Sequence, residues 1–114
     1  MASTSVITSP DVTTTTVSRL SARFASLRAE GRKALVCYVT AGHPNPTESV
    51  ELLRGLARAG ADVIEVGVPF SDPMADGPVI QQSSQTALDH GITFSRTLDI
   101  IREAAVDVPI VLFS

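Results

Sequence analysis

The chain has 114 residues, of which 44% are hydrophobic and 18% are charged, and its formal net charge is -3. This composition is typical of a globular α/β domain, and the acidic balance argues against a nucleic-acid-binding protein, which needs a basic surface. No apolar stretch reaches the roughly 20 residues that span a bilayer, and the single cysteine, Cys37, has no partner for an internal disulfide. These features predict a cytoplasmic protein without a membrane-spanning segment.

Residues 1–16 are rich in serine and threonine and offer little apolar surface to offset the entropy cost of ordering. We therefore expect a disordered tail, followed by one domain over residues 17–114. A transit peptide is the alternative, but such peptides are rich in arginine, and the first arginine here is Arg19. Beyond the tail, the spacing predicts a helix that ends near Gly31 and carries apolar residues on one face. These residues are Val17, Leu20, Phe24 and Leu27.

Residues 34–40 form a continuous apolar run of strand length, as expected for a parallel strand that is buried on both faces. A helix should follow this strand, because Asn45 is a good N-cap, Pro46 suits the first helical position and Glu48 completes a capping-box pattern. Gly60 should end the helix in a left-handed conformation. The predicted core-facing residues of this helix are Val50, Leu52, Leu53, Leu56 and Ala57.

A second buried strand is predicted over residues 63–68, and a turn-rich segment follows it. One helix should cover residues 78–90, and another should begin after Thr93 as its N-cap. The predicted buried face of that last helix comprises Phe94, Leu98, Ile101 and Ala104. Residues 109–113 are predicted to form a third strand. The alternation of strands and helices indicates a parallel sheet with right-handed crossover connections.

The segment 64–77 carries the candidate chemistry, because it places Glu65 inside an apolar strand and Asp76 in the loop that follows. Side chains alternate along a strand, so Glu65 should share a face with Val63 and with Gly67, which leaves room beside it. Burial disfavours an ionised carboxylate, which would make Glu65 a usable proton donor near neutral pH. Two structural alternatives stay open. Glu65 could instead pair with a cation on another strand, and Asp76 could only stabilise the start of the next helix.

The same segment resembles the signature of the tryptophan synthase alpha chain family. It reads Ile-Glu-Val-Gly, Pro-Phe-Ser-Asp-Pro and Ala-Asp-Gly-Pro over residues 64–67, 69–73 and 75–78, and the likeness extends over residues 23–114. The resemblance implies an α/β fold that comprises a leading helix and the first three strands of a TIM (β/α)₈ barrel. Such a barrel needs about 250 residues, so we expect this chain to be an incomplete barrel. A complete small doubly wound domain is the alternative.

The resemblance also implies a lyase of tryptophan biosynthesis, which cleaves indole-3-glycerol phosphate to indole and glyceraldehyde 3-phosphate in a retro-aldol reaction. Glu65 matches the family's general acid/base, and Asp76 matches the carboxylate that accepts a hydrogen bond from the indole N–H. Phe70 matches an aromatic position that could contact substrate or only pack, and Pro69 and Asp72 fall in the loop that faces the beta chain. No cofactor is implied for this chain, because pyridoxal phosphate is expected only in the partner beta chain of an alpha2beta2 complex.

The family binds the substrate phosphate after its seventh and eighth strands, which lie beyond Ser114, so we expect the chain alone to be inactive. One alternative is a non-catalytic fragment that binds or modulates the beta chain through residues 69–78. Another is a different phosphate-sugar barrel enzyme. His43 and His90 have no neighbouring ligands at metal-binding spacing, so no metal site is predicted.

Overall fold

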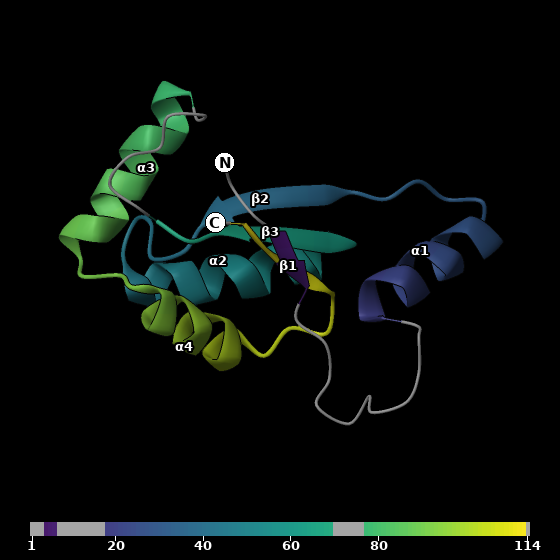
Figure 1. Cartoon of the computed structure of the whole chain (residues 1–114). Coiled ribbons are helices and arrows are strands. Elements are labelled where there is room, and N and C mark those ends of the chain that lie inside the picture. Colours follow the sequence, from purple (N-terminus) through teal and green to yellow (C-terminus); the bar gives the residue numbers. More distant parts are fainter. Residues whose placement is uncertain (1–3, 7–17, 70–76, 114) are drawn as a thin grey trace.

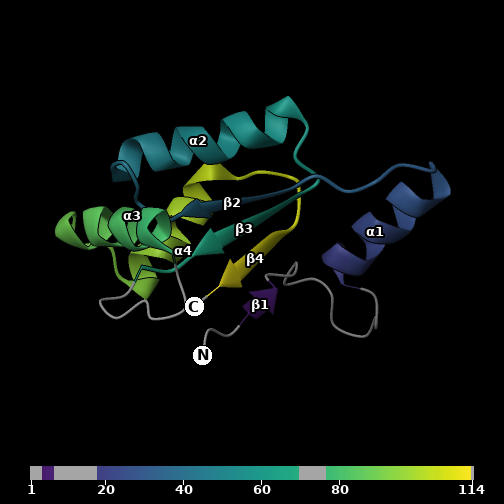
Figure 2. The same ribbon diagram turned by 90° about the horizontal axis from the view of Figure 1, so that it is seen from above.

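The computed structural model describes residues 4–6, 18–69 and 77–113 of the chain (Figure 1). Its sheet contains, in spatial order, β1 (Thr4–Val6), β4 (Ile110–Phe113), β3 (Val63–Gly67) and β2 (Val36–Thr40). Its helices are α1 (Arg19–Ala29), α2 (Pro46–Ala59), α3 (Pro78–Asp89) and α4 (Phe94–Ala104). Helices α2 and α4 cover one face of the sheet, α3 lies beyond the carboxyl ends of the strands, and α1 lies beyond their amino ends (Figures 1 and 2).

Strands β2, β3 and β4 are parallel, which confirms the predicted α/β order. The register places Glu65 of β3 between Tyr38 of β2 and Val111 of β4. The adjacent residues of β3, Ile64 and Val66, are fully buried and belong to the core formed with α2 and α4. Because side chains alternate along a strand, Glu65 points to the opposite face of the sheet, as predicted.

The predicted helix ends agree with the observed caps. The Asn45 side chain accepts a hydrogen bond from the Glu48 N–H at 2.9 Å and donates one to the Glu48 carboxylate at 3.0 Å. Thr93 caps α4 by accepting from the Arg96 N–H at 3.1 Å. Gly60 ends α2 with a φ of 114°, a left-handed conformation that glycine adopts without a steric penalty.

The buried faces of α2 and α4 differ in part from the prediction. Leu52 and Phe94 were expected in the core, but they are 39% and 54% exposed. Ser49 of α2 and Thr97 of α4 are buried instead, and each is satisfied by a hydrogen bond. The Ser49 hydroxyl accepts from the Gly42 N–H at 2.9 Å, and the Thr97 hydroxyl donates to the Thr93 carbonyl at 2.9 Å. A hydroxyl paired in this way can occupy a core position, which a pattern of apolar residues does not detect.

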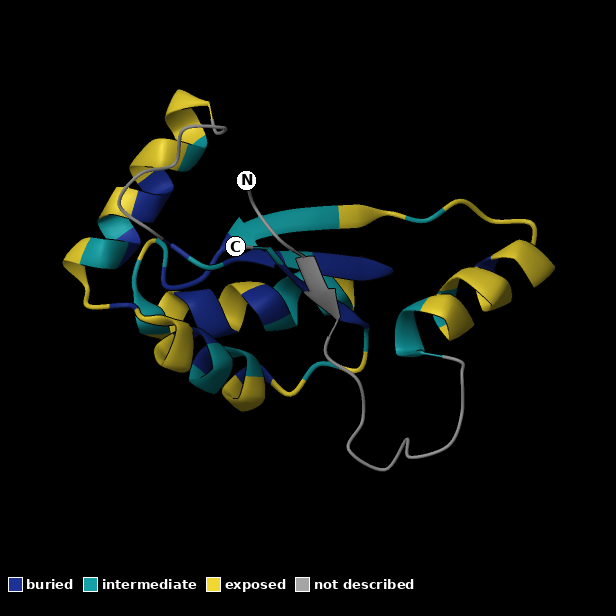
Figure 3. Cartoon of the chain, in the orientation of Figure 1, coloured by how far each residue is buried: buried dark blue, intermediate teal, exposed yellow. Residues whose placement is uncertain are grey.

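Helix α1 covers less apolar surface than its sequence pattern predicts. Leu27 is its only buried side chain, and Phe24, which was expected on the same face, is 41% exposed. Val17 lies outside the described residues. Figure 3 shows the same contrast across the molecule, because buried residues gather where the sheet meets α2 and α4, whereas α1 is largely exposed.

The strand β1 lies within the segment for which we expected disorder. Thr4–Val6 pair antiparallel with β4, with Thr4 opposite Phe113 and Val6 opposite Val111. The free edge of β4 presents unpaired backbone groups, and a short extended segment can satisfy them. The prediction therefore fails at these three residues, whereas residues 1–3 and 7–16 of the expected tail lie outside the described part of the chain. No helix in the described ranges has the length and apolar character required to cross a membrane.

Candidate active site

Glu65 lies at the centre of β3, and its side chain is half-buried whereas the other residues of that strand are buried. A cavity of about 330 Å³ adjoins it, lined by Tyr38, Glu65, Ile80 and Phe113. These four residues come from β2, β3, α3 and β4, so elements spread over more than half of the chain build one site. The cavity lies on the face of the sheet that α2 and α4 leave uncovered.

Gly67 determines where the aromatic wall of this cavity stands. A Cβ atom added at Gly67 would lie 2.0 Å from Oη and 2.7 Å from Cζ of Tyr38, which shows that the Tyr38 ring passes directly over this glycine. The Tyr38 ring meets Phe113 edge to face, with centroids 6.5 Å apart and an interplanar angle of 87°. The space that Gly67 leaves is therefore filled by Tyr38, and the two rings form one side of the cavity.

The walls around the Glu65 carboxyl are aromatic and aliphatic, apart from the Tyr38 hydroxyl. Within residues 18–69 and 77–113, no arginine, lysine or histidine forms an ion pair with Glu65. The described residues thus lend no support to the alternative of a structural ion pair. A carboxyl group in such a cavity can give a proton to, or take one from, a bound aromatic ring.

The other predicted site residues fall on or beside the segment that follows β3. Pro69 is buried and lies two residues after the end of β3. Phe70, Asp72 and Asp76 lie outside the described residues, so their predicted roles stay predictions. Gly77 is the N-cap of α3 and provides no side-chain hydrogen bond to the helix. The structural alternative for Asp76, a favourable charge near this helix N-terminus, consequently also stays open.

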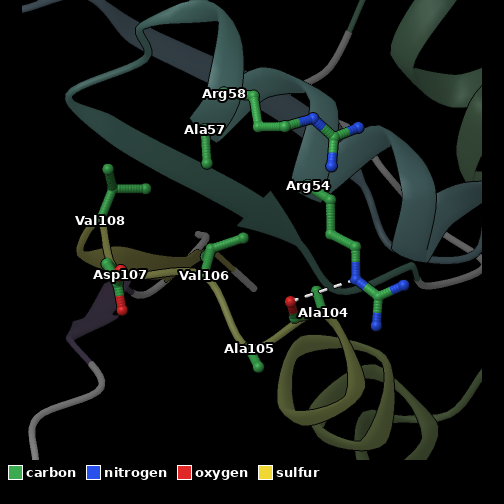
Figure 4. A pocket seen from close by; sticks show the side chains of 8 residues that line it. All are labelled: Arg54, Ala57, Arg58, Ala104, Ala105, Val106, Asp107 and Val108. Carbon is green, nitrogen blue, oxygen red and sulfur yellow. Dashed lines mark hydrogen bonds between the residues drawn. The ribbon is translucent and has the colours of Figure 1, made fainter.

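A second cavity of about 320 Å³ lies at the other end of the strands, between α2 and the chain leaving α4, and Figure 4 shows its lining residues. The guanidinium group of Arg54 in this cavity already forms hydrogen bonds within the protein. The Arg54 guanidinium donates from Nε to the Ala104 carbonyl at 3.3 Å and from Nη2 to the Glu103 carbonyl at 2.8 Å. These are carbonyl groups that the end of a helix leaves without partners, so Arg54 joins α2 to α4. Because parallel α/β folds bind ligands at the carboxyl ends of their strands, the cavity beside Glu65 is the better candidate.

Asp62 is a buried carboxylate that was not among the predicted site residues. Its Oδ1 accepts hydrogen bonds from Arg23 at 2.6 Å and from Arg32 at 3.2 Å, and its Oδ2 accepts from the Leu35 backbone N–H at 2.8 Å. The hydrogen bond from the Leu35 amide, together with the two guanidinium groups, holds the pKa of Asp62 below its ordinary value of 3.8, although burial opposes this. The sequence signal was a carboxylate directly before an apolar strand. The cluster lies at the amino end of β3, so we assign it to the stability of the fold.

The two histidines lie in different parts of the fold. His43 is half-buried in the turn after β2, and His90 is exposed at the end of α3. Among the residues that the structure describes, no three histidine, cysteine, aspartate or glutamate side chains gather in a way that could hold a metal ion.

Comparison with known proteins identifies the family. A profile described as tryptophan synthase alpha chain matches residues 24–114, which is most of the chain. The chain belongs to the tryptophan synthase alpha chain family. The matched region begins within α1 and contains β2, β3, β4 and helices α2 to α4.

Two relatives illustrate the similarity within the tryptophan synthase alpha chain family. The tryptophan synthase alpha chain of Burkholderia thailandensis is 56% identical over 99 residues, which cover 84% of this chain and 36% of the relative. That of Thioalkalivibrio sulfidiphilus is 52% identical over 99 residues, which cover 84% of this chain and 37% of the relative. The chain therefore spans a little over a third of the length of these curated relatives.

Solved structures agree with the family assignment. Tryptophan synthase subunit alpha from Legionella pneumophila str. Paris superposes with a TM-score of 0.78 at 41% identity, covering 81% of this chain and 36% of that chain. A structure of tryptophan synthase from M. tuberculosis in an aminoacrylate-bound form gives a TM-score of 0.74 at 38% identity, covering 81% and 39%. The three parallel strands with their helices are thus part of the tryptophan synthase alpha TIM barrel, which confirms the predicted fold class.

Proposed function

We propose that this chain is part of a lyase of tryptophan biosynthesis, which cleaves indole-3-glycerol phosphate to indole and glyceraldehyde 3-phosphate. The observation that supports the proposal most strongly is Glu65, a half-buried carboxyl on β3, beside a cavity of about 330 Å³ that has the Tyr38 and Phe113 rings on one side. Because the chain spans 36% to 37% of the length of its relatives, the proposal concerns the protein that contains the whole barrel.

In the proposed reaction, Glu65 acts as general acid and gives a proton to the ring carbon of indole that carries the glycerol phosphate side chain. Protonation leaves a positive charge on the ring nitrogen, and Asp76 stabilises it by accepting a hydrogen bond from the indole N–H. The bond between the ring and the side chain then breaks, and its electron pair returns to the ring. The Glu65 carboxylate, which the first step leaves ionised, takes the proton of the side-chain hydroxyl, and the carbon that carries this hydroxyl becomes the aldehyde of glyceraldehyde 3-phosphate. General acid catalysis of this kind is worth about 10²- to 10⁴-fold in rate.

Further parts of the proposal concern substrate binding and partners. Phe70 would contact the substrate ring, whereas Pro69 and Asp72 would face a tryptophan synthase beta chain in an alpha2beta2 complex. The similarity to a structure of tryptophan synthase from M. tuberculosis supports the choice of this partner. The chain itself would need no cofactor, pyridoxal phosphate would belong to the beta chain, and the complex would be cytoplasmic. Retention of a beta chain during purification would test the partner.

A chimaera provides the test of the activity. Residues 24–114 of this chain would replace the corresponding segment of the Burkholderia thailandensis alpha chain, which is 56% identical. The release of indole from indole-3-glycerol phosphate would be measured for the chimaera and for its Glu65→Gln variant. We expect Glu65→Gln to lower kcat by about 10²- to 10⁴-fold with little change in KM, because the substitution removes a proton needed only in the transition state.

The matched control is Glu103→Gln, which removes an exposed carboxylate on α4 and should leave turnover unchanged. Circular dichroism would show that each variant keeps the barrel. Undiminished turnover in Glu65→Gln would refute the assignment of Glu65, and an inactive but folded chimaera would refute the proposed activity of this segment.

A further inference from the structure

Helix α1 is attached to the rest of the molecule by few apolar contacts. Only Leu27 is buried, and Figures 1 and 2 show α1 apart from the layers formed by the sheet, α2 and α4. A cavity of about 300 Å³ lies between α1 and the chain that enters β4. It is lined by Arg19, Ala22, Arg23, Ser26, Asp107 and Pro109. The interface between α1 and the rest of the chain is therefore not closely packed, in contrast to the core between the sheet and helices α2 and α4.

What holds α1 in place is mainly charge. Arg23, from the middle of α1, and Arg32, from the loop after it, both reach Oδ1 of Asp62, at 2.6 Å and 3.2 Å. The Asp62 side chain is 4% exposed, whereas those of Arg23 and Arg32 are 35% and 55% exposed. Charge-assisted hydrogen bonds to a buried carboxylate are stronger than neutral ones. The guanidinium of Arg19 adds a contact to the Asp107 carbonyl, which is a neutral acceptor.

Docking also leaves one group of α1 unsatisfied. The Nε atom of Arg23 is buried and has no hydrogen-bond partner among the described residues. A buried donor without an acceptor opposes the docked state, and water would satisfy it once α1 moves away. The bond between Arg23 and Asp62 has to outweigh this cost. Without the bond to Asp62, the Arg23 guanidinium would form more hydrogen bonds in solvent than in its docked position.

We propose that Arg23, Arg32 and Asp62 form an ionic latch, and that α1 detaches as a unit when this latch is broken, while the sheet, α2 and α4 stay folded. Detachment exposes Leu27 and uncovers the amino ends of β2 and β3. The hydrogen bond from the Leu35 N–H to Oδ2 of Asp62 joins β2 to β3 and does not involve α1, so it stays in place when α1 leaves. The latch can therefore break without breaking this hydrogen bond between the strands.

Native-state hydrogen exchange of the 114-residue chain tests the latch. In Arg23→Gln, which leaves the bond between Asp62 and Leu35 intact, the α1 amides should exchange about tenfold faster or more, and the β3 amides should keep their rates. The matched control is Arg58→Gln, which removes the same charge from an exposed position on α2 and should change neither set. A second variant, Asp62→Asn, should also release α1, since it keeps an acceptor but loses the charge.

Salt gives an independent measurement on the unmodified chain. Because both arginines are partly exposed, raising the ionic strength to about 1 M should screen the latch and speed exchange in α1 selectively. Exchange of α1 and β3 amides at one common rate in all variants would overturn the proposal, because α1 would then unfold only with the whole domain. Equal effects of Arg23→Gln and Arg58→Gln would overturn it as well.

Discussion

The contact between Gly67 and Tyr38 makes a quantitative prediction about the wall of the candidate site. In Gly67→Ala, the new methyl carbon would lie 2.0 Å from Oη, 2.7 Å from Cζ and 3.1 Å from Cε2 of Tyr38, whereas ordinary contacts begin at 3.4 Å. The Tyr38 ring must therefore move. Overpacking of this kind costs about 1–3 kcal/mol, and loss of the edge-to-face contact with Phe113 accounts for about 0.5–1.5 kcal/mol of such a change.

The lower entropy of the unfolded chain in Gly67→Ala acts in the opposite direction and raises the free energy of unfolding. Replacing a glycine inside a strand by alanine stabilises the folded state by about 0.5–1 kcal/mol through the entropy of the unfolded chain. We therefore expect Gly67→Ala to lower the free energy of unfolding by roughly 1–2 kcal/mol, from the difference of these effects. In a Tyr38→Ala background the clash is gone, and Gly67→Ala should be neutral or slightly stabilising.

The assay is urea unfolding of the four proteins of this double-mutant cycle, followed by far-ultraviolet circular dichroism. The chain has one tyrosine and no tryptophan, so the fluorescence of Tyr38 also reports the displaced ring directly in Gly67→Ala. Gly55→Ala is the control, because an added Cβ there meets nothing within 4 Å and the substitution should stabilise α2. A coupling energy near zero between positions 38 and 67 would refute the reasoning, since contacting residues should couple by about 0.5–3 kcal/mol.

Two further predictions concern the core and the response to acid. Leu53→Ala removes a fully buried side chain of α2 and should cost about 2–5 kcal/mol, measured by urea unfolding, whereas truncation of the exposed Leu52 should cost much less. The pKa of Asp62 is lowered on folding, so its ionised form stabilises the fold at pH values above about 4, and this contribution is lost as the pH falls through the lowered pKa. Melting temperatures between about pH 2 and pH 7 should therefore fall less at the acid end in Asp62→Asn than in the parent, and parallel curves would contradict this role.

Local features of the sequence were sufficient to predict most secondary structure and the position of the key carboxyl. The caps at Asn45 and Thr93 and the stop at Gly60 depend on groups within four residues, so their effect can be read along the chain. The alternation of side chains along a strand likewise predicted that Glu65 points away from Ile64 and Val66, which the structure places in the core.

The surroundings of that carboxyl were decided by the tertiary structure. Tyr38, Ile80 and Phe113 line the cavity because parallel pairing fixes the register of β2, β3 and β4 and a crossover brings α3 over their carboxyl ends. No spacing along the chain specifies these neighbours, since register depends on pairing between distant segments. The buried hydroxyl of Thr97 was missed for a related reason, because a polar side chain enters a core only when its hydrogen bond is made.

At the amino ends of the strands, too, local sequence predicted the elements and the tertiary structure decided their contacts. The sequence by itself determined that α1 forms and where it ends, because its spacing and Gly31 act locally. Only the folded chain brought Arg23 and Arg32 to Asp62, which lies 39 and 30 residues away. Helix formation depends on neighbours in sequence, whereas the attachment of a helix depends on which charged and apolar groups the completed sheet places opposite it.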